Sequence, residues 1–479
     1  MKRLITLLCA AAIVLGAQGT AQAIEVKASG TWEMGMGWAD NPRFTDAENG
    51  TYHDPFYAAQ RVRPQFDFIA EETLRAVLAF EIGTVIWGES SDDSPGGAID
   101  SDGKSVKVRR MYIDWSPVEN LQLRMGVQGV ALPSAALGNP ILDSDIAGIV
   151  ASYAFNDNVG LTAFWLRPFD GGWNKTETKN QLDEMDMFGL TLPVSGEGFS
   201  VTPWAMYARN GNNSDFWTYR WEMTGDGDVP DEVEGFKGST NLWWAGAAVE
   251  IDLLDPISFK FDAMYGAAKG DDAPEFSGFL LSTLVEYNSE AWWGNPGIFG
   301  WYASGDSDDD YEDGNYGKYG RMPIVGADNA GFAPTMYGFP GTAGCLDDSI
   351  LSSSGVGTLG IGLQLDGISF VDSLSHTLRA AYIRGTNDED MIRNNPNVDR
   401  EAGSTGFGYP YNNMGDHVYL TKKDAAWEVD VVSTWEATDN LTFFLELGWL
   451  KLDLDDDVWD KRSDTEDAWK AQIMLEFSY

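Results

Sequence analysis

The sequence predicts an all-β fold: a transmembrane, antiparallel, up-and-down β-barrel of about eighteen strands, with sixteen as the alternative. Three observations support this prediction. Short stretches alternate apolar and polar residues with a period of two, tight turns and long loops follow one another in order, and aromatic residues gather near the ends of the stretches. Alternation with a period of two is typical of strands that have one apolar face.

The alternation is clear in residues 257–265, where Ile257, Phe259 and Phe261 share one face of an extended chain. Val, Ile, Thr and aromatic residues are frequent in these stretches, in agreement with strand propensity. The predicted strands span residues 25–39, 56–69, 74–88, 104–116, 121–130, 146–155, 159–169, 184–194, 198–209, 240–254, 257–269, 276–289, 293–304, 355–366, 374–386, 424–437, 440–453 and 467–479.

The connections between the stretches are of two kinds. Tight connections occur at residues 71–73, 116–120, 156–158, 195–198, 254–256 and 437–440. Long, acidic, glycine-rich connections occur at residues 40–55, 89–103, 131–145, 170–183, 210–239, 305–354, 387–423 and 454–466. Their alternation indicates successive antiparallel hairpins, with tight turns at one end of the sheet and long loops at the other. No linker interrupts this order, so residues 24–479 are predicted to form a single domain.

The N-terminal segment, residues 1–23, has the pattern of a secretory signal peptide. Lys2 and Arg3 precede a short apolar core, and a small-residue cleavage signal ends at Ala23. We therefore expect export and cleavage after Ala23. The apolar core is shorter than the roughly 20 residues that a membrane-spanning helix needs. Cys345 is then the single remaining cysteine, so an intramolecular disulfide is excluded.

The composition excludes several classes of function. The formal net charge is −42 at pH 7, and an acidic chain of this kind is not expected to bind nucleic acid. High net charge is also typical of disordered chains, but 19 Trp, 18 Tyr and 24 Phe contradict that interpretation.

A soluble β-sandwich or propeller also contains many short strands, but the placement of the aromatic residues favours a membrane barrel. Aromatic belts mark the two membrane interfaces of outer-membrane barrels. The aromatic residues near stretch ends are Trp32, Trp38, Trp115, Trp165, Trp243, Trp427, Trp435, Trp449 and Tyr479. In lipid every backbone N–H and C=O needs a partner, so the sheet must close on itself. We therefore predict a bacterial outer-membrane location, with residues 467–479 paired antiparallel to the N-terminal strand.

The signal segment, the alternating strands and the terminal LEFSY resemble the trimeric outer-membrane porins of Gram-negative bacteria. The opening IEVKASGTWEMGMGW and the closing aromatic strand are similar to the homotrimeric porins of sulfate-reducing bacteria. The resemblance implies a homotrimer of water-filled barrels, in contact with outer-membrane lipid and lipopolysaccharide. It also implies that the loop after the fifth strand folds inward. Phe477 and Tyr479 would then form the sorting signal that the barrel-assembly machinery reads.

A cluster of arginines is predicted on the inner face of four adjacent strands. The apolar phase of these strands points outward, so the residues between the apolar positions point into the lumen. The inward arginines are Arg61, Arg63, Arg75, Arg110 and Arg124. They are predicted to form a strip that pairs with oxyanions at a constriction. Alternatively, they stiffen the wall by pairing with Asp67, Glu81 and Asp114, and the two roles are compatible.

Carboxylates opposite the arginine strip would set a transverse field across the pore. Asp143 and Asp145 are the candidates, because they lie in the expected inward loop at residues 132–145. The alternation slips at Lys107 and Arg109, which is typical of a β-bulge, so the facing of these two residues is left open.

The acidic loops are weak candidates for Ca²⁺ binding, since closely spaced carboxylates supply oxygen ligands. The candidate ligands are Asp306, Asp308, Asp310, Asp455 and Asp457. Neither acidic run has the spacing of an EF-hand loop, and a solvated acidic surface is the simpler interpretation. No other cofactor is expected.

The predicted function is passive diffusion of small hydrophilic solutes and ions, with small anions favoured at the constriction. A substrate-specific channel is the alternative, followed by a structural or adhesive barrel. An enzyme is not expected, because His53, His376 and His417 lie near no nucleophile motif.

Overall fold

The computed structural model describes most of the barrel and parts of the long loops. The described residues are 24–41, 56–91, 94–95, 97–98, 106–171, 183–214, 216, 239–270, 275–289, 291–307, 311–312, 315–316, 318–325, 332–336, 354–393 and 418–479. The predicted signal peptide, His53, His417, Cys345, Asp308 and Asp310 lie outside the described residues.

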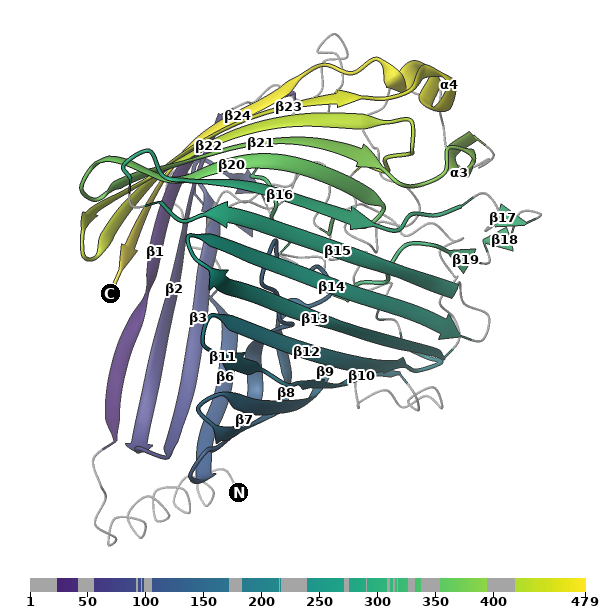
Figure 1. Cartoon of the computed structure of the whole chain (residues 1–479). Coiled ribbons are helices and arrows are strands. Elements are labelled where there is room, and N and C mark those ends of the chain that lie inside the picture. The colour runs from purple at the N-terminus through teal and green to yellow at the C-terminus, as the bar shows by residue number, and fades with distance from the viewer. Residues whose placement is uncertain are drawn as a thin grey trace, which may run out of the picture.

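The chain forms a closed antiparallel barrel of eighteen strands, as the alternation predicts (Figure 1). The wall strands are β1 (Glu25–Asp40), β2 (Phe56–Glu71), β3 (Leu74–Ile86), β6 (Val106–Val118), β7 (Leu121–Ala131), β8 (Asp143–Asn156), β9 (Val159–Asp170), β10 (Glu184–Thr191) with β11 (Val194–Gly196), β12 (Phe199–Asn210), β13 (Thr240–Leu254), β14 (Ile257–Gly270), β15 (Glu275–Tyr287), β16 (Asn295–Ala303), β20 (Thr358–Val371), β21 (Leu374–Gly385), β22 (Ala425–Thr438), β23 (Leu441–Asp453) and β24 (Ala468–Ser478). Each of the eighteen predicted stretches corresponds to one of these wall strands.

The barrel closes between its first and last strands. β24 pairs antiparallel with β1 from Thr31–Ser478 to Asp40–Trp469, and with β23 on its other side. Gly30 and Tyr479 exchange two backbone hydrogen bonds of 3.0 and 3.1 Å at the end of the chain. The predicted pairing of residues 467–479 with the N-terminal strand is confirmed, and Figure 1 shows purple β1 beside yellow β24.

Alternation along each strand separates an apolar outer face from an inner face. On β6, Met111, Ile113 and Trp115 are exposed, whereas Asp114 between them is 5% exposed. On β1 the exposed residues Trp32 and Trp38 alternate with inward side chains in the same way. A continuous apolar exterior of this kind fits a bilayer rather than water. No helix among the described residues is long and apolar enough to cross a membrane, a result that does not bear on spans made of strands.

The helices whose bounds the structure describes are short and lie at the loop end of the barrel (Figure 1). They are α3 (Asp390–Arg393), α4 (Asp456–Trp459) and the 3₁₀ helix η6 (Asp460–Ser463). The minor strands β4 (Ser90–Ser91), β5 (Ser94–Pro95), β17 (Tyr311–Glu312) and β18 (Asn315–Tyr316) form two short ribbons in the loops, and β19 (Lys318–Tyr319) pairs parallel with β15.

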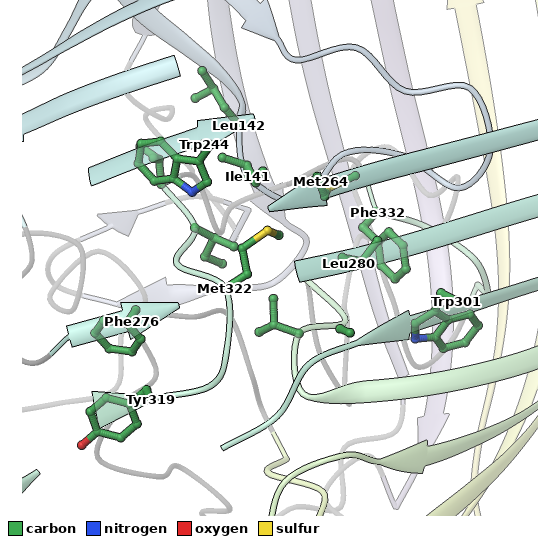
Figure 2. Packing of buried hydrophobic residues seen from close by; sticks show 14 of the residues in the cluster. Ile141, Leu142, Trp244, Met264, Phe276, Leu280, Trp301, Tyr319, Met322 and Phe332 are labelled. Carbon is green, nitrogen blue, oxygen red and sulfur yellow. The ribbon is translucent and has the colours of Figure 1, made fainter. Parts of the chain in front are cut away.

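A large apolar cluster fills part of the barrel interior. Inward side chains of wall strands from β8 to β24, such as Leu166 and Trp244, pack against residues of the loops, such as Ile141 and Met322. Figure 2 shows Trp244, Met264, Leu280 and Trp301 projecting from wall strands toward these loop residues. The Trp244 indole N–H also donates to the Pro323 carbonyl at 2.7 Å, so the buried ring keeps a polar partner. Folded-back loops therefore occupy one side of the lumen.

Asp424 fastens the segment before β22 to helix α4. Its buried carboxylate accepts hydrogen bonds from the backbone N–H and hydroxyl of Thr421, from the Asp455 N–H and from the Trp459 indole. Burial raises the pKa of Asp424, against the opposing effect of these four donors. The four contacts tie together two loops that are distant in the sequence.

The raised pKa of Asp424 makes this connection pH-dependent. The folded loops favour the protonated carboxyl, so their stability is fully present at acid pH and falls as the pH rises through the raised pKa. Hydrogen exchange of the Thr421 and Asp455 amides, corrected for intrinsic rates, should show faster opening at neutral than at acid pH. Asp424→Asn should flatten this dependence. An unchanged pH slope in Asp424→Asn would assign the effect to another group.

Candidate functional site

The loop after the fifth wall strand crosses the lumen. Residues 132–142 leave β7 and reach the inner face of β14, where the Asp262 carboxylate is 1% exposed. That carboxylate accepts hydrogen bonds from the Ala135 N–H at 2.7 Å, the Ala136 N–H at 2.8 Å and the Ser134 hydroxyl at 2.8 Å. The inward fold that the porin resemblance implies for this loop is therefore present.

The inward loop also joins other folded-back segments. The Val325 N–H donates to the Ile141 carbonyl at 2.9 Å, and the Ala333 N–H donates to the Leu137 carbonyl at 3.0 Å. Leu137 and Ile141 belong to the apolar cluster. The loop is thus part of a packed body that covers the wall from β8 onward.

The uncovered side of the lumen carries the predicted arginines. On β2, Arg61 pairs with Glu33 at 2.8 Å and Arg63 pairs with Glu81 at 2.9 Å. The Arg63 side chain is 26% exposed, so its ion pair stays in contact with solvent. Asp67, which was considered as a partner for these arginines, accepts a hydrogen bond from Gln65 at 3.2 Å.

Nearer the tight turns, Asp114 on β6 holds two arginines from its neighbouring strands. Arg75 on β3 donates to it through two nitrogens at 2.8 and 3.0 Å, and Arg124 on β7 through two at 2.7 and 3.0 Å. The Arg124 guanidinium also lies over the Tyr112 ring, 4.5 Å from its centroid. Two cations share one anion, so this group has a net positive charge, and the Arg75 side chain is 41% exposed.

The arginines therefore follow the barrel axis rather than forming a single ring. Arg61 and Arg63 lie toward the loop end of β2, and Arg75 and Arg124 lie close to the tight turns. Every one of them is paired with a wall carboxylate, which agrees with the stiffening role. Their partial exposure keeps the oxyanion-binding role available, and that role stays a prediction.

Arg110 belongs to a different group from the other four. The register of β3 with β6 shifts between Ala79 and Phe80, which places the predicted bulge at Arg109. Arg109 and Arg110 both bind Asp145, at 2.7 and 2.6 Å. A bulge brings consecutive side chains to the same side of a strand, so one carboxylate can hold both.

The predicted placement of Asp143 and Asp145 in the inward loop is wrong. The loop ends at residue 142, and both aspartates begin β8, which starts at Asp143. Strand pairing continues further along β8 than the sequence pattern indicates, because Asp143 still pairs with Ala131 on β7. Asp145 therefore contacts arginines of the neighbouring wall rather than facing them across the lumen.

Two of the three candidate calcium ligands in the described part of the chain, Asp306 and Asp455, have other roles. Asp306 is 1% exposed and binds the Arg321 guanidinium at 2.8 Å. Asp455 caps helix α4 by accepting from the Asp457 N–H. Among the described residues, no group of three or more His, Cys, Asp or Glu side chains could hold a metal ion.

Sequence reasoning missed three polar contacts that bring distant residues together. Arg321 pairs with Asp306 across 15 positions, and Lys260 lies 3.5 Å from Glu286 on the inner wall. His376 Nδ1 lies 2.8 Å from the Ser433 hydroxyl, and the strand register places both residues on the outer face of the barrel. The two wall contacts follow from the strand register and the Asp306–Arg321 pair from packing between loop segments, and no local motif encodes either.

Comparison with known proteins identifies the fold alone. No protein-family model matches the sequence, and no curated protein matches it. Among solved structures, it is similar to Pseudomonas aeruginosa OccK11 (OpdR), with 12% identity, a TM-score of 0.51 and 95% of each chain covered. P. aeruginosa OccK8 (OprE) matches with 12% identity and a TM-score of 0.51, over 95% of this chain and 98% of that chain. Acinetobacter baumannii OccAB3 matches with 9% identity and a TM-score of 0.51, over 95% and 99%. The chain shares with these proteins the architecture of an eighteen-stranded antiparallel barrel.

Proposed function

We propose that this chain is an outer-membrane porin that passes small hydrophilic solutes and ions. The observation that carries the proposal is the two-sided lumen. Folded-back loops pack against wall strands from β8 to β24, whereas the inner faces of β2, β3 and β7 keep partly exposed arginines. Because ion pairs line one side of the lumen and a packed body fills the other, we expect the aqueous path to run off-centre, along the arginines.

The arginines on this path support a preference for small anions. Arg holds its charge at any working pH and presents a planar fork to oxyanions. Arg75 and Arg124 share one carboxylate and so carry a net positive charge, whereas the chain as a whole is strongly acidic. The acidic loops attract cations, whereas the arginines on the path attract anions.

A substrate-specific channel is the second candidate. The filling of one side of the lumen by packed loops favours it, because a narrow path lined by fixed ion pairs can select by shape as well as by charge. The two candidates differ in solute dependence: a specific channel saturates with one solute at low concentration, and a general porin does not.

Planar-bilayer recording tests the proposal directly. The wild-type protein should open stable conductances, and replacement of Arg63, Arg75 and Arg124 by Gln should shift the reversal potential in a salt gradient toward cation selectivity. Arg167→Gln is a matched control. Arg167 pairs with Asp186 at 2.8 Å and lies opposite Ala147 on the outer face of the barrel. It is therefore an ion-paired arginine outside the path.

Two outcomes would count against the proposal. Absence of any conductance in correctly folded protein would remove both channel functions. An unchanged reversal potential in the triple variant, with conductance intact, would remove the anion-favouring role of the arginines and leave the channel in place.

We further propose the homotrimer, the contacts with lipopolysaccharide and recognition by the barrel-assembly machinery, all of which rest on the porin resemblance. The structural comparison lends no support to a special closeness with the porins of sulfate-reducing bacteria. Cross-linking of the protein in outer membranes should trap trimers, and a product limited to monomers would contradict the assembly.

A further inference from the structure

The loop-side ends of β7 and β8 form a ribbon that departs from the barrel wall. In the continuously described stretch 106–171, the register of β6 with β7 ends at Met111–Val127, although β6 extends to Val106 and β7 to Ala131. The register of β8 with β9 likewise stops at Ala147–Arg167. Between these limits β7 and β8 stay paired with each other as far as Ala131–Asp143.

The ribbon leans into the lumen. Residues 128–131 and 143–146 pair with each other and have left both neighbouring strands, and the Leu132 N–H continues the ribbon by donating to the Leu142 carbonyl at 3.0 Å. Leu132, Leu142 and Ile146 are buried in the apolar cluster inside the barrel. Pro168 occupies the β9 edge that the ribbon has vacated, a place that suits a residue without a backbone N–H.

Two carboxylates hold the ribbon at its two ends. At the root, Asp145 binds the guanidinium groups of Arg109 and Arg110 on β6 and so spans the gap in backbone pairing. At the tip, Asp262 on the far wall accepts two consecutive backbone N–H groups and the Ser134 hydroxyl. Each carboxylate holds several donors at once, so each anchor outweighs a loop contact made by a single hydrogen bond.

We infer that Asp262 and Asp145 are positioning residues that fix how far this ribbon and its loop extend across the pore. The inference rests on the proposed channel function. It also reassigns Arg109 and Arg110, which hold the constricting element in place while Arg61, Arg63, Arg75 and Arg124 line the path. The tip anchor has the larger effect, because residues 133–141 have no strand partner of their own.

Single-channel recording of Asp262→Ala tests the tip anchor. The loop should move between positions once its carboxylate partner is gone, so the open channel should show a larger mean conductance and several-fold higher current noise than wild type. Ser282→Ala is the matched control: its hydroxyl donates to Asp262 at 3.2 Å from the neighbouring strand β15, and its removal leaves the three hydrogen bonds from the loop to Asp262 in place, so the conductance should stay at the wild-type value. Asp145→Ala should also raise the noise, by a smaller factor.

A reversible cross-link guards against a variant that fails to fold. The Ser134 hydroxyl and the Asp262 carboxylate lie 2.8 Å apart, so a Ser134→Cys, Asp262→Cys pair in a Cys345→Ser background brings two thiols to neighbouring positions, and thiol titration checks that they have formed a disulfide. The oxidised channel should be quiet, and reduction after insertion should produce the noise seen with Asp262→Ala. Equal conductance and noise in the oxidised, reduced and wild-type channels would overturn the inference. Loss of all conductance in the wild-type protein would instead refute the proposed function.

Discussion

Deletion of β24 should abolish the folded barrel altogether. The strand contributes ten register pairs with β1 and ten with β23. Without it, both neighbours expose a row of N–H and C=O groups to lipid, where each unsatisfied group costs several kcal/mol. The expected result is complete loss of the heat-modifiable folded species on gel electrophoresis after refolding into detergent or lipid. A truncated protein that still migrates as a folded barrel would contradict the closure.

A milder variant separates closure from targeting. Phe477→Ala with Tyr479→Ala leaves the backbone ladder in place, because strand pairing does not depend on these side chains. Refolding in vitro should therefore succeed. If the terminal aromatics are the sorting signal, the same variant should fail to reach the outer membrane in cells, and normal insertion there would contradict that role.

Removal of the Asp306 carboxylate should cost about 3–5 kcal/mol of loop stability, because it leaves a buried charge without its counterion. The Arg321 side chain is 1% exposed, and Asp306 accepts from its Nε at 2.8 Å and from its backbone N–H at 3.1 Å. The Tyr419 hydroxyl donates to the same carboxylate at 3.0 Å. This pair therefore joins three loop segments that are distant in the sequence.

Hydrogen exchange measures the effect on the loops separately from the barrel. In Asp306→Ala, the amides of residues 304–307 and 318–325 should exchange much faster, whereas those of β22 and β23 should not change. The double variant Asp306→Leu with Arg321→Met should recover most of the protection, since apolar replacement of a whole buried pair is often neutral. Poor protection in the double variant would show that the pair contributes specific geometry that apolar packing cannot replace.

The strand pattern predicts the wall well because closure leaves little freedom. Every strand must place one face toward lipid, so the period of two persists even in stretches rich in glycine, such as residues 355–366. The interruption between β10 and β11 is an exception: Pro193 has no backbone N–H for the ladder, and the alternation passes over it unchanged. The bulge at Arg109 was visible because the alternation itself slips there.

The candidate site was predictable only in part, because alternation gives the face on which a residue lies but not its partner. Inward arginines follow from alternation along single strands, and four of the five pair with carboxylates of adjacent strands, whereas Arg110 on β6 pairs with Asp145 on β8. The position of Asp145 depends on a ribbon that leaves the wall, and the partner of Asp306 lies in another loop segment. Such contacts arise from packing in three dimensions, which no local spacing records. The role of Asp262 was hidden for the same reason, since its partners are 126 to 128 positions away.

The two sides of the lumen have different roles: one packs against the loops, and the other carries the partly exposed arginines. Inward side chains of wall strands from β8 to β24 pack against the loops, so changes there disturb the fold. On the other side, the Arg63 and Arg75 side chains are 26% and 41% exposed, and neither residue belongs to the apolar cluster. Substitution of these arginines should therefore change which solutes pass through the barrel while the apolar cluster stays in place. This side of the lumen is the one on which selectivity can change without loss of the fold.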